Sequence, residues 1–133
     1  MKLLLDTHAL LWSIIAPEQL SSAAHDAIAD PSAQVAVSAV SFWEISIKSS
    51  LGKLSLSGVS PEQLVDAALQ QGFELLPLDP RLPASFYRFP ADPQHRDPFD
   101  RMLVWQAISL GCTLVSRDRK IADNQRSDLR VLW

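Results

Sequence analysis

Short apolar runs alternate along this chain with longer segments that carry helix start and stop signals. Runs of strand length lie at 2–5, 34–39, 73–78, 112–116 and 129–133. Helices are predicted at 8–15, 22–29, 41–52, 61–72 and 98–111, with a short helix around 82–88 in a proline-rich stretch. Strands that alternate with helices and are apolar throughout predict an α/β protein with a three-layer α/β/α fold and a mostly parallel central sheet. We expect one domain over residues 1–133.

Capping and stop residues set the boundaries of two of these helices. Ser41 is the predicted start of the helix at 41–52, and Gly52 is its stop signal. Asp97 is the predicted N-cap of the helix at 98–111, because Pro98 suits the first helical position. Gly111 is the C-terminal stop of that helix.

Four acidic residues accompany the strand-forming runs: Asp6, Glu44, Asp100 and Asp118. In open α/β sheets, ligands bind beyond the carboxyl ends of the strands, so these carboxylates are expected to form one pocket there. Carboxylates brought together repel one another unless a cation neutralises them. Oxygen ligands favour Mg²⁺, with Mn²⁺ as a substitute, and the only cysteine is Cys112, which excludes a thiolate zinc site.

Asp6 and Glu44 each have a structural explanation as well, and the sequence leaves both open. Asp6 precedes a helix and could cap it. Ser41 and Glu44 have the spacing of a capping box, in which the glutamate accepts a hydrogen bond from the amide of the cap residue. Glu44 also stands four residues before Lys48, the spacing of an ordinary helical ion pair.

The same ambiguity applies to the two later acids. With Asp97 as the cap, Asp100 falls in the first helical turn, where negative charge is favoured by the helix dipole. Asp118 lies between Arg117 and Arg119 and could be a solvated turn residue. The Asp97-Pro98-Phe99-Asp100 segment offers two carboxylates, and either one could ligate the metal.

Charge is distributed unevenly around a net charge of −3. Residues 1–80 hold three basic and nine acidic residues, whereas residues 81–133 hold nine basic and six acidic ones. Basic groups beside an acidic pocket suit a polyanionic substrate, although a solvated basic surface explains them equally well. The 47% hydrophobic and 20% charged residues are typical of a globular protein. Because no run resembles a signal peptide or a membrane span, we expect a cytoplasmic protein without membrane contact.

The remaining chemistry-bearing residues point to no other reaction. The sequence has no Ser-His-Asp order and no glycine-rich phosphate-binding motif. His8 could touch substrate, and His95 could approach a phosphate, but a structural or solvent role is favoured for each. The four tryptophans fit core or interface packing.

At these residues the chain resembles the PIN-domain ribonucleases, specifically the VapC-type toxins of prokaryotic toxin–antitoxin pairs. The matching motifs are LLLDTHALLW (3–12), VSAVSFWEISIK (37–48), GKLSL (52–56), HRDPFDRMLVWQA (95–107), TLVSRD (113–118) and the terminal RVLW. The resemblance implies Mg²⁺-dependent cleavage of RNA, usually tRNA or rRNA. It also implies a homodimer and inhibition by a cognate antitoxin whose tail fills the active-site groove.

The resemblance also assigns roles to individual residues. It implies Asp6, Glu44 and Asp100 as the core metal-binding and catalytic acids and Asp118 as the fourth, and leaves Asp97 as the cap or an alternative ligand. The candidates for substrate binding are Thr7, Ser116, Arg101, Arg117, Lys48 and His95. Ser116 stands where many relatives carry threonine, and the hydroxyl is retained.

Two other functions stay open on the sequence. The first is a catalytically silent module that binds RNA or an antitoxin, in which the acids only cap helices. The second is a nuclease of the same fold that acts on DNA. Metal-dependent turnover separates the first from a nuclease, and matched RNA and DNA oligonucleotides separate the second.

Overall fold

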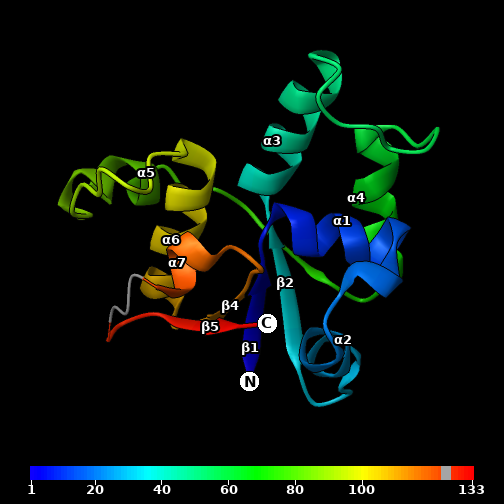
Figure 1. Cartoon of the computed structure of the whole chain (residues 1–133), viewed down its shortest axis with the longest axis horizontal. Coiled ribbons are helices and arrows are strands. Elements are labelled where there is room, and N and C mark those ends of the chain that lie inside the picture. Colours follow the sequence, from blue (N-terminus) through cyan, green and yellow to red (C-terminus); the bar gives the residue numbers. More distant parts are fainter. Residues whose placement is uncertain (124–126) are drawn as a thin grey trace.

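A computed structural model describes residues 1–123 and 127–133 (Figure 1). The strands are β1 (Lys2–Leu5), β2 (Gln34–Ser38), β3 (Glu74–Leu76), β4 (Thr113–Val115) and β5 (Arg130–Leu132). The α-helices are α1 (Thr7–Ile15), α2 (Ser22–Ala29), α3 (Ala39–Ser50), α4 (Pro61–Gln70), α5 (Arg81–Ser85), α6 (Pro98–Leu110) and α7 (Arg119–Ala122). Short 3₁₀ turns occupy Pro17–Gln19 and Phe86–Arg88.

The five strands form one sheet in the order β3-β2-β1-β4-β5, and every pairing is parallel. β1 lies at the centre, where Leu4 pairs with Ala36 on one side and with Leu114 on the other. Its leucines are fully buried because helices cover both faces of the sheet. The predicted three-layer α/β/α fold is confirmed, and the sheet is parallel throughout the part that the structure describes.

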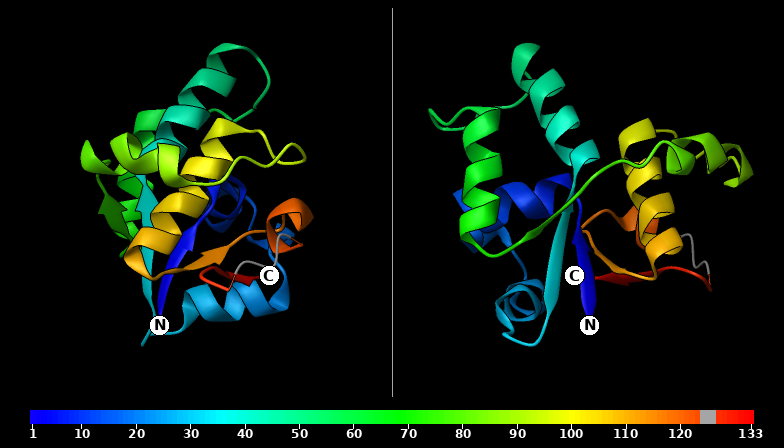
Figure 2. Two further views of the ribbon diagram at one scale, coloured as in Figure 1. Left: turned by 90° about the vertical axis from the view of Figure 1, so that its left-hand side faces the viewer. Right: turned by 180° about the vertical axis from the view of Figure 1, so that it is seen from behind.

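Alternate residues of the central strand enter two separate hydrophobic cores. Leu3 and Leu5 pack in a core with side chains of α1, α2 and α4, whereas Leu4 packs in the other core with side chains of α6 and α7. Figure 1 shows α1, α2 and α4 on one side of the strands and α5, α6 and α7 on the other, and Figure 2 shows the same division from behind. This two-sided burial explains why the strands are continuously apolar.

Helix ends agree with the capping signals, with one exception. Asp97 caps α6, and Gly111 ends it in the left-handed region at φ 66°. The helix predicted to start at Ser41 instead starts at Ala39, and Ser38 is its cap, accepting a hydrogen bond from the Val40 amide (3.1 Å). The predicted Ser41–Glu44 capping box is therefore wrong.

The strand ends and three helix starts meet at one edge of the sheet. α1 begins directly after β1, and α3 begins directly after β2. α6 leads back into β4, so its N-terminus also lies at the carboxyl edge, where α3 contacts both α1 and α6 (Figures 1 and 2). Within the described ranges, no helix has the length and apolar character that crossing a membrane requires.

Candidate active site

Asp6 lies between the end of β1 and the start of α1 and is buried. Its carboxylate accepts a hydrogen bond from the Ala9 amide (2.8 Å), so it caps α1. Burial raises the pKa of Asp6 above its ordinary value, while hydrogen bonds from the Ser116 hydroxyl and the Ala9 amide oppose that rise. The Ser116 hydroxyl also accepts a hydrogen bond from the Asp118 amide (3.1 Å), which links two of the candidate acids.

Glu44 lies in the second turn of α3, and only 2% of the residue is exposed. Its Oε1 accepts a hydrogen bond from the Thr7 hydroxyl (2.6 Å), and its Oε2 pairs with Lys48. The hydrogen bond that the Lys48 ammonium donates to Glu44 raises the pKa of Lys48. Thr7 is itself buried, so the position predicted to bind substrate fixes the glutamate side chain in this structure.

Asp97 and Asp100 lie at the start of α6 and differ in their contacts. Asp97 Oδ1 accepts hydrogen bonds from the amides of Phe99 (2.9 Å) and Asp100 (3.1 Å), which is the capping role predicted for it. Burial and the neighbouring carboxylates of Asp97, Glu44, Asp6 and Asp118 raise the pKa of Asp100 to about 7. Asp100 therefore lies at the electrostatic centre of the cluster, and the other four acids surround it.

Asp118 follows β4 and caps α7, with its Oδ1 accepting a hydrogen bond from the Lys120 amide (2.9 Å). Together with Asp6 and Asp100 it lines a cavity of about 280 Å³. The exposed Arg117 lines the same cavity, and its guanidinium lies 5.7 Å from the centroid of the Trp12 ring. A cation and an aromatic face thus border the acidic pocket.

Two sets of donor atoms in this cluster lie close enough to share an ion. Ligand atoms of Glu44, Asp97 and Asp100 lie within 4.8 Å of one another, as do those of His95, Asp100 and Asp118. Carboxylate oxygens suit Mg²⁺, which accepts one or two carboxylates directly and keeps several waters. The donors that are present therefore fit a hard divalent cation.

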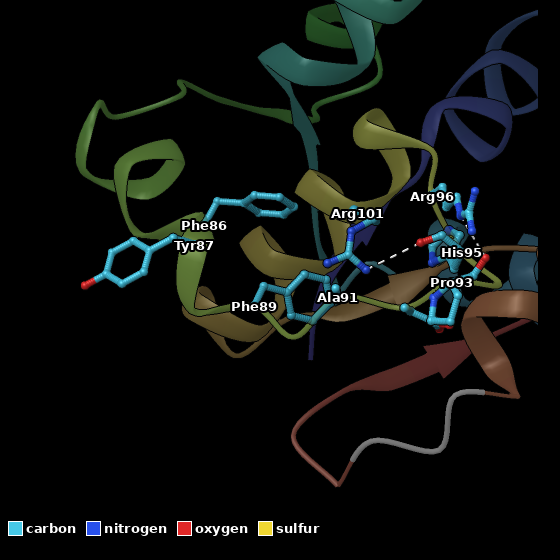
Figure 3. A pocket seen from close by; sticks show the side chains of 9 residues that line it. Phe86, Tyr87, Phe89, Ala91, Pro93, His95, Arg96 and Arg101 are labelled. Atoms are coloured by element: carbon cyan, nitrogen blue, oxygen red, sulfur yellow. Dashed lines mark hydrogen bonds between the residues drawn. The ribbon is translucent and has the colours of Figure 1, made fainter.

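Arg101 does not join this cavity. Its guanidinium lies 4.5 Å from the centroid of the Phe89 ring and donates to the carbonyl of Pro90 (2.9 Å). The residue is 8% exposed and lines a different cavity, of about 540 Å³, beside the loop before α6 (Figure 3). Arg101 follows Asp100 directly in the sequence, but their side chains lie apart because consecutive helical residues point in different directions.

Two residues at the pocket were assigned elsewhere or left open by the sequence. Trp12 was expected in packing, yet it lines the acidic cavity, and its ring lies 5.4 Å from that of His8. The spacing of His8 and Trp12 by one helical turn after Asp6 is a signal that could have placed them together. His8, for which a structural or solvent role was favoured, also lines the cavity.

Comparison with known families gives this cluster a context. The family model described as PIN domain matches residues 3–126. The chain belongs to the PIN-domain family. This PIN domain is 27% identical over 130 residues to Ribonuclease VapC22 of Mycobacterium tuberculosis (strain ATCC 25618 / H37Rv), covering 98% of this chain and 97% of that protein. The resemblance noted from the sequence motifs is thereby confirmed.

Solved structures share the PIN fold at low identity. A chain of VapBC2 from Rickettsia felis, solved with a DNA fragment from its promoter, has a TM-score of 0.72 and 16% identity, covering 100% of this chain and 99% of that one. A chain of VapBC-5 from Mycobacterium tuberculosis, a member of the VapBC family of toxin–antitoxin systems, has a TM-score of 0.59 and 16% identity, with coverage of 98% and 97%. At these identities the likeness concerns the fold.

Proposed function

We propose that this PIN domain is a Mg²⁺-dependent endoribonuclease and the toxin of a toxin–antitoxin pair, cleaving tRNA or rRNA. The observation that carries the proposal is the convergence of four carboxylates on the partly buried Asp100; burial, together with these carboxylates, raises its pKa to about 7. Such a cluster is unfavourable for the protein alone and favourable around a divalent cation. The name of the relative VapC22, a ribonuclease, supports RNA as the substrate.

The acids Asp6, Glu44, Asp100 and Asp118 would hold the cation, with Asp97 as a cap that also offers an oxygen. When bound, a divalent cation supplies an activated water and stabilises the charge that develops on a scissile phosphate. Mn²⁺ is expected to substitute for Mg²⁺ because it also accepts oxygen ligands.

The neighbouring side chains have distinct parts in this proposal. Thr7 fixes Glu44 by its hydrogen bond, and Lys48 balances part of the negative charge. The Ser116 hydroxyl holds the Asp6 carboxylate through a hydrogen bond. In this proposal the exposed Arg117, which lines the acidic cavity, pairs with a phosphate of the RNA, and the Trp12 ring beside it stacks with a base.

The decisive experiment compares the wild type with Asp100→Asn on RNA and on DNA of matched sequence, with Mg²⁺ and with a chelator. RNA cleavage is expected to require the cation and to fall by at least ~100-fold in the variant, because the central ligand loses its charge. Asp66→Asn, an exposed carboxylate on α4, is the matched control and is expected to keep full activity.

Four outcomes would count against the proposal. Cleavage that survives chelation, or full activity in Asp100→Asn, would remove the carboxylate mechanism. RNA binding without turnover would favour the silent binding module, and preferential cleavage of DNA would favour a DNA nuclease.

The expected partners are a cognate antitoxin and a second copy of this chain. The structure of VapBC-5, a member of the VapBC family of toxin–antitoxin systems, supports an antitoxin. Expression together with any co-encoded small protein, followed by purification, is expected to yield a complex with low RNase activity. Light scattering on the free chain tests the homodimer, and cell fractionation tests the expected cytoplasmic location.

A further inference from the structure

His95 is a buried imidazole at the edge of the acidic cluster. Its side chain is only 6% exposed, and it comes from the loop between the turn Phe86–Arg88 and α6. Its Nε2 has no hydrogen-bond partner among residues 1–123 and 127–133. Asp100 Oδ2 lies 3.8 Å from Nε2, which is beyond hydrogen-bond distance. A buried polar nitrogen without a partner is costly, so this position calls for a ligand.

The loop that carries His95 is held in place from the protein side. Arg101 donates to the carbonyls of Pro90 (2.9 Å) and His95 (3.4 Å), and the His95 amide donates to the Asp92 carbonyl (3.2 Å). Figure 3 shows the Arg101 guanidinium beside the Phe89 ring, with its hydrogen bond reaching the His95 backbone. The imidazole is therefore positioned before any ligand arrives.

The spacing around Nε2 matches that of ligands around one ion. Donor atoms of His95, Asp100 and Asp118 all lie within 4.8 Å of one another. Ligands at about 2.1 Å from an octahedral ion lie roughly 3 Å apart when adjacent and roughly 4.2 Å apart when opposite. Small side-chain adjustments would thus bring all three donors onto a single cation.

We propose that His95 is a metal ligand, and that with Asp100 and Asp118 it forms a mixed nitrogen and oxygen site that prefers Mn²⁺ to Mg²⁺. Imidazole suits transition metals, whereas carboxylates alone suit Mg²⁺. The second donor set, Glu44 with Asp97 and Asp100, contains only oxygen ligands and shares Asp100 with the first. Asp100 then lies between two cation positions, of which the one with His95 prefers Mn²⁺ and the one with oxygen ligands alone prefers Mg²⁺.

The inference rests on the proposed metal centre, and its test measures the coordination of the bound metal ion and not RNA cleavage. The full chain is stripped of metal, loaded with Mn²⁺ and measured by pulsed electron paramagnetic resonance for magnetic coupling to a directly bound nitrogen. The coupling is expected in the wild type and in His8→Gln, which alters the imidazole that lines the cavity with Asp100 and Asp118, and is expected to vanish in His95→Gln. The Mn²⁺ affinity relative to Mg²⁺ is expected to fall at least ~10-fold in His95→Gln.

The outcomes separate this inference from the proposed function. Bound Mn²⁺ with oxygen coordination alone would overturn the role of His95 and leave a carboxylate centre, as expected if His95 only forms an ion pair with Asp100. Failure of both cations to bind would overturn the metal-dependent nuclease as well. If His95→Gln does not fold, nitrogen coupling that persists in His8→Gln assigns the ligand, because His25 is exposed on α2 and lines a different cavity.

Discussion

Replacing Asp100 by asparagine is expected to stabilise the metal-free protein while it abolishes cleavage. Asparagine keeps the size of the side chain and removes a charge that burial and four nearby carboxylates disfavour. Because the pKa of Asp100 is about 7 in the folded state and 3.8 ordinarily, the folded protein binds the extra proton between these two values. Wild-type stability is therefore lost as the pH rises from about 4 through 7, and the variant lacks this loss.

The magnitude follows from the difference between the two pKa values. A rise from 3.8 to about 7 corresponds to ~4 kcal/mol at most, at 1.36 kcal/mol per pKa unit. The Asp100 side chain is 25% exposed, so solvent screening lowers the expected effect to ~2 kcal/mol. Burial also raises the pKa of Asp6, so both proteins lose stability from this group as the pH rises. That contribution cancels when the variant is compared with the wild type.

Urea unfolding in chelator, followed by tryptophan fluorescence at about pH 4 and about pH 8, measures this effect. The variant is expected to exceed the wild type by ~2 kcal/mol at the higher pH and to equal it at the lower one. Added Mg²⁺ is expected to reverse the order at the higher pH, since it binds the wild-type carboxylate. Equal pH dependence in the two proteins would refute the convergence of charge on Asp100.

Three further substitutions test the contacts around the site. Thr7→Val removes the hydroxyl that donates to buried Glu44, and is expected to lower the free energy of unfolding by ~1.5–3 kcal/mol, measured by urea denaturation, with reduced RNA cleavage. Arg101→Lys removes the planar guanidinium that holds the loop before α6, and is expected to lower the free energy of unfolding by ~2 kcal/mol. Hydrogen exchange in the segment 90–95, measured by mass spectrometry, is expected to become faster. Unchanged exchange would contradict the anchoring role of Arg101. Ser116→Ala removes a hydrogen bond that lowers the pKa of Asp6, so that pKa is expected to rise further in a carboxyl ¹³C NMR titration.

The sequence predicts much of the fold because the parallel sheet imposes a simple pattern. Central strands are covered on both faces, so β1 and β4 read as continuous apolar runs. The cap at Asp97 and the stop at Gly111 are confirmed because each depends on backbone geometry within a few residues. The start of α3 was predicted too late because Ser38, the actual cap, is also the last residue of β2, so that strand and helix follow each other without a loop.

Roles that depend on distant contacts could not be predicted from local patterns. Thr7 and Glu44 are 37 residues apart, and only the folded sheet edge brings the hydroxyl to the carboxylate. Arg101 follows Asp100 directly, yet its side chain packs on Phe89. The unpartnered nitrogen of His95 is likewise a property of the folded loop, because the sequence around His95 does not show that the imidazole is buried.

Helix capping and metal binding were weighed as competing explanations for these acids, and the geometry makes them compatible. Asp6, Asp97 and Asp118 each use Oδ1 to accept a backbone amide, so the capping hydrogen bond does not occupy the second carboxylate oxygen. The capping hydrogen bond fixes the side chain, so the second carboxylate oxygen is already oriented before the cation binds. Asparagine can keep the cap while it removes the charge, whereas alanine removes both. Asparagine variants therefore separate the catalytic role of these residues from the structural one.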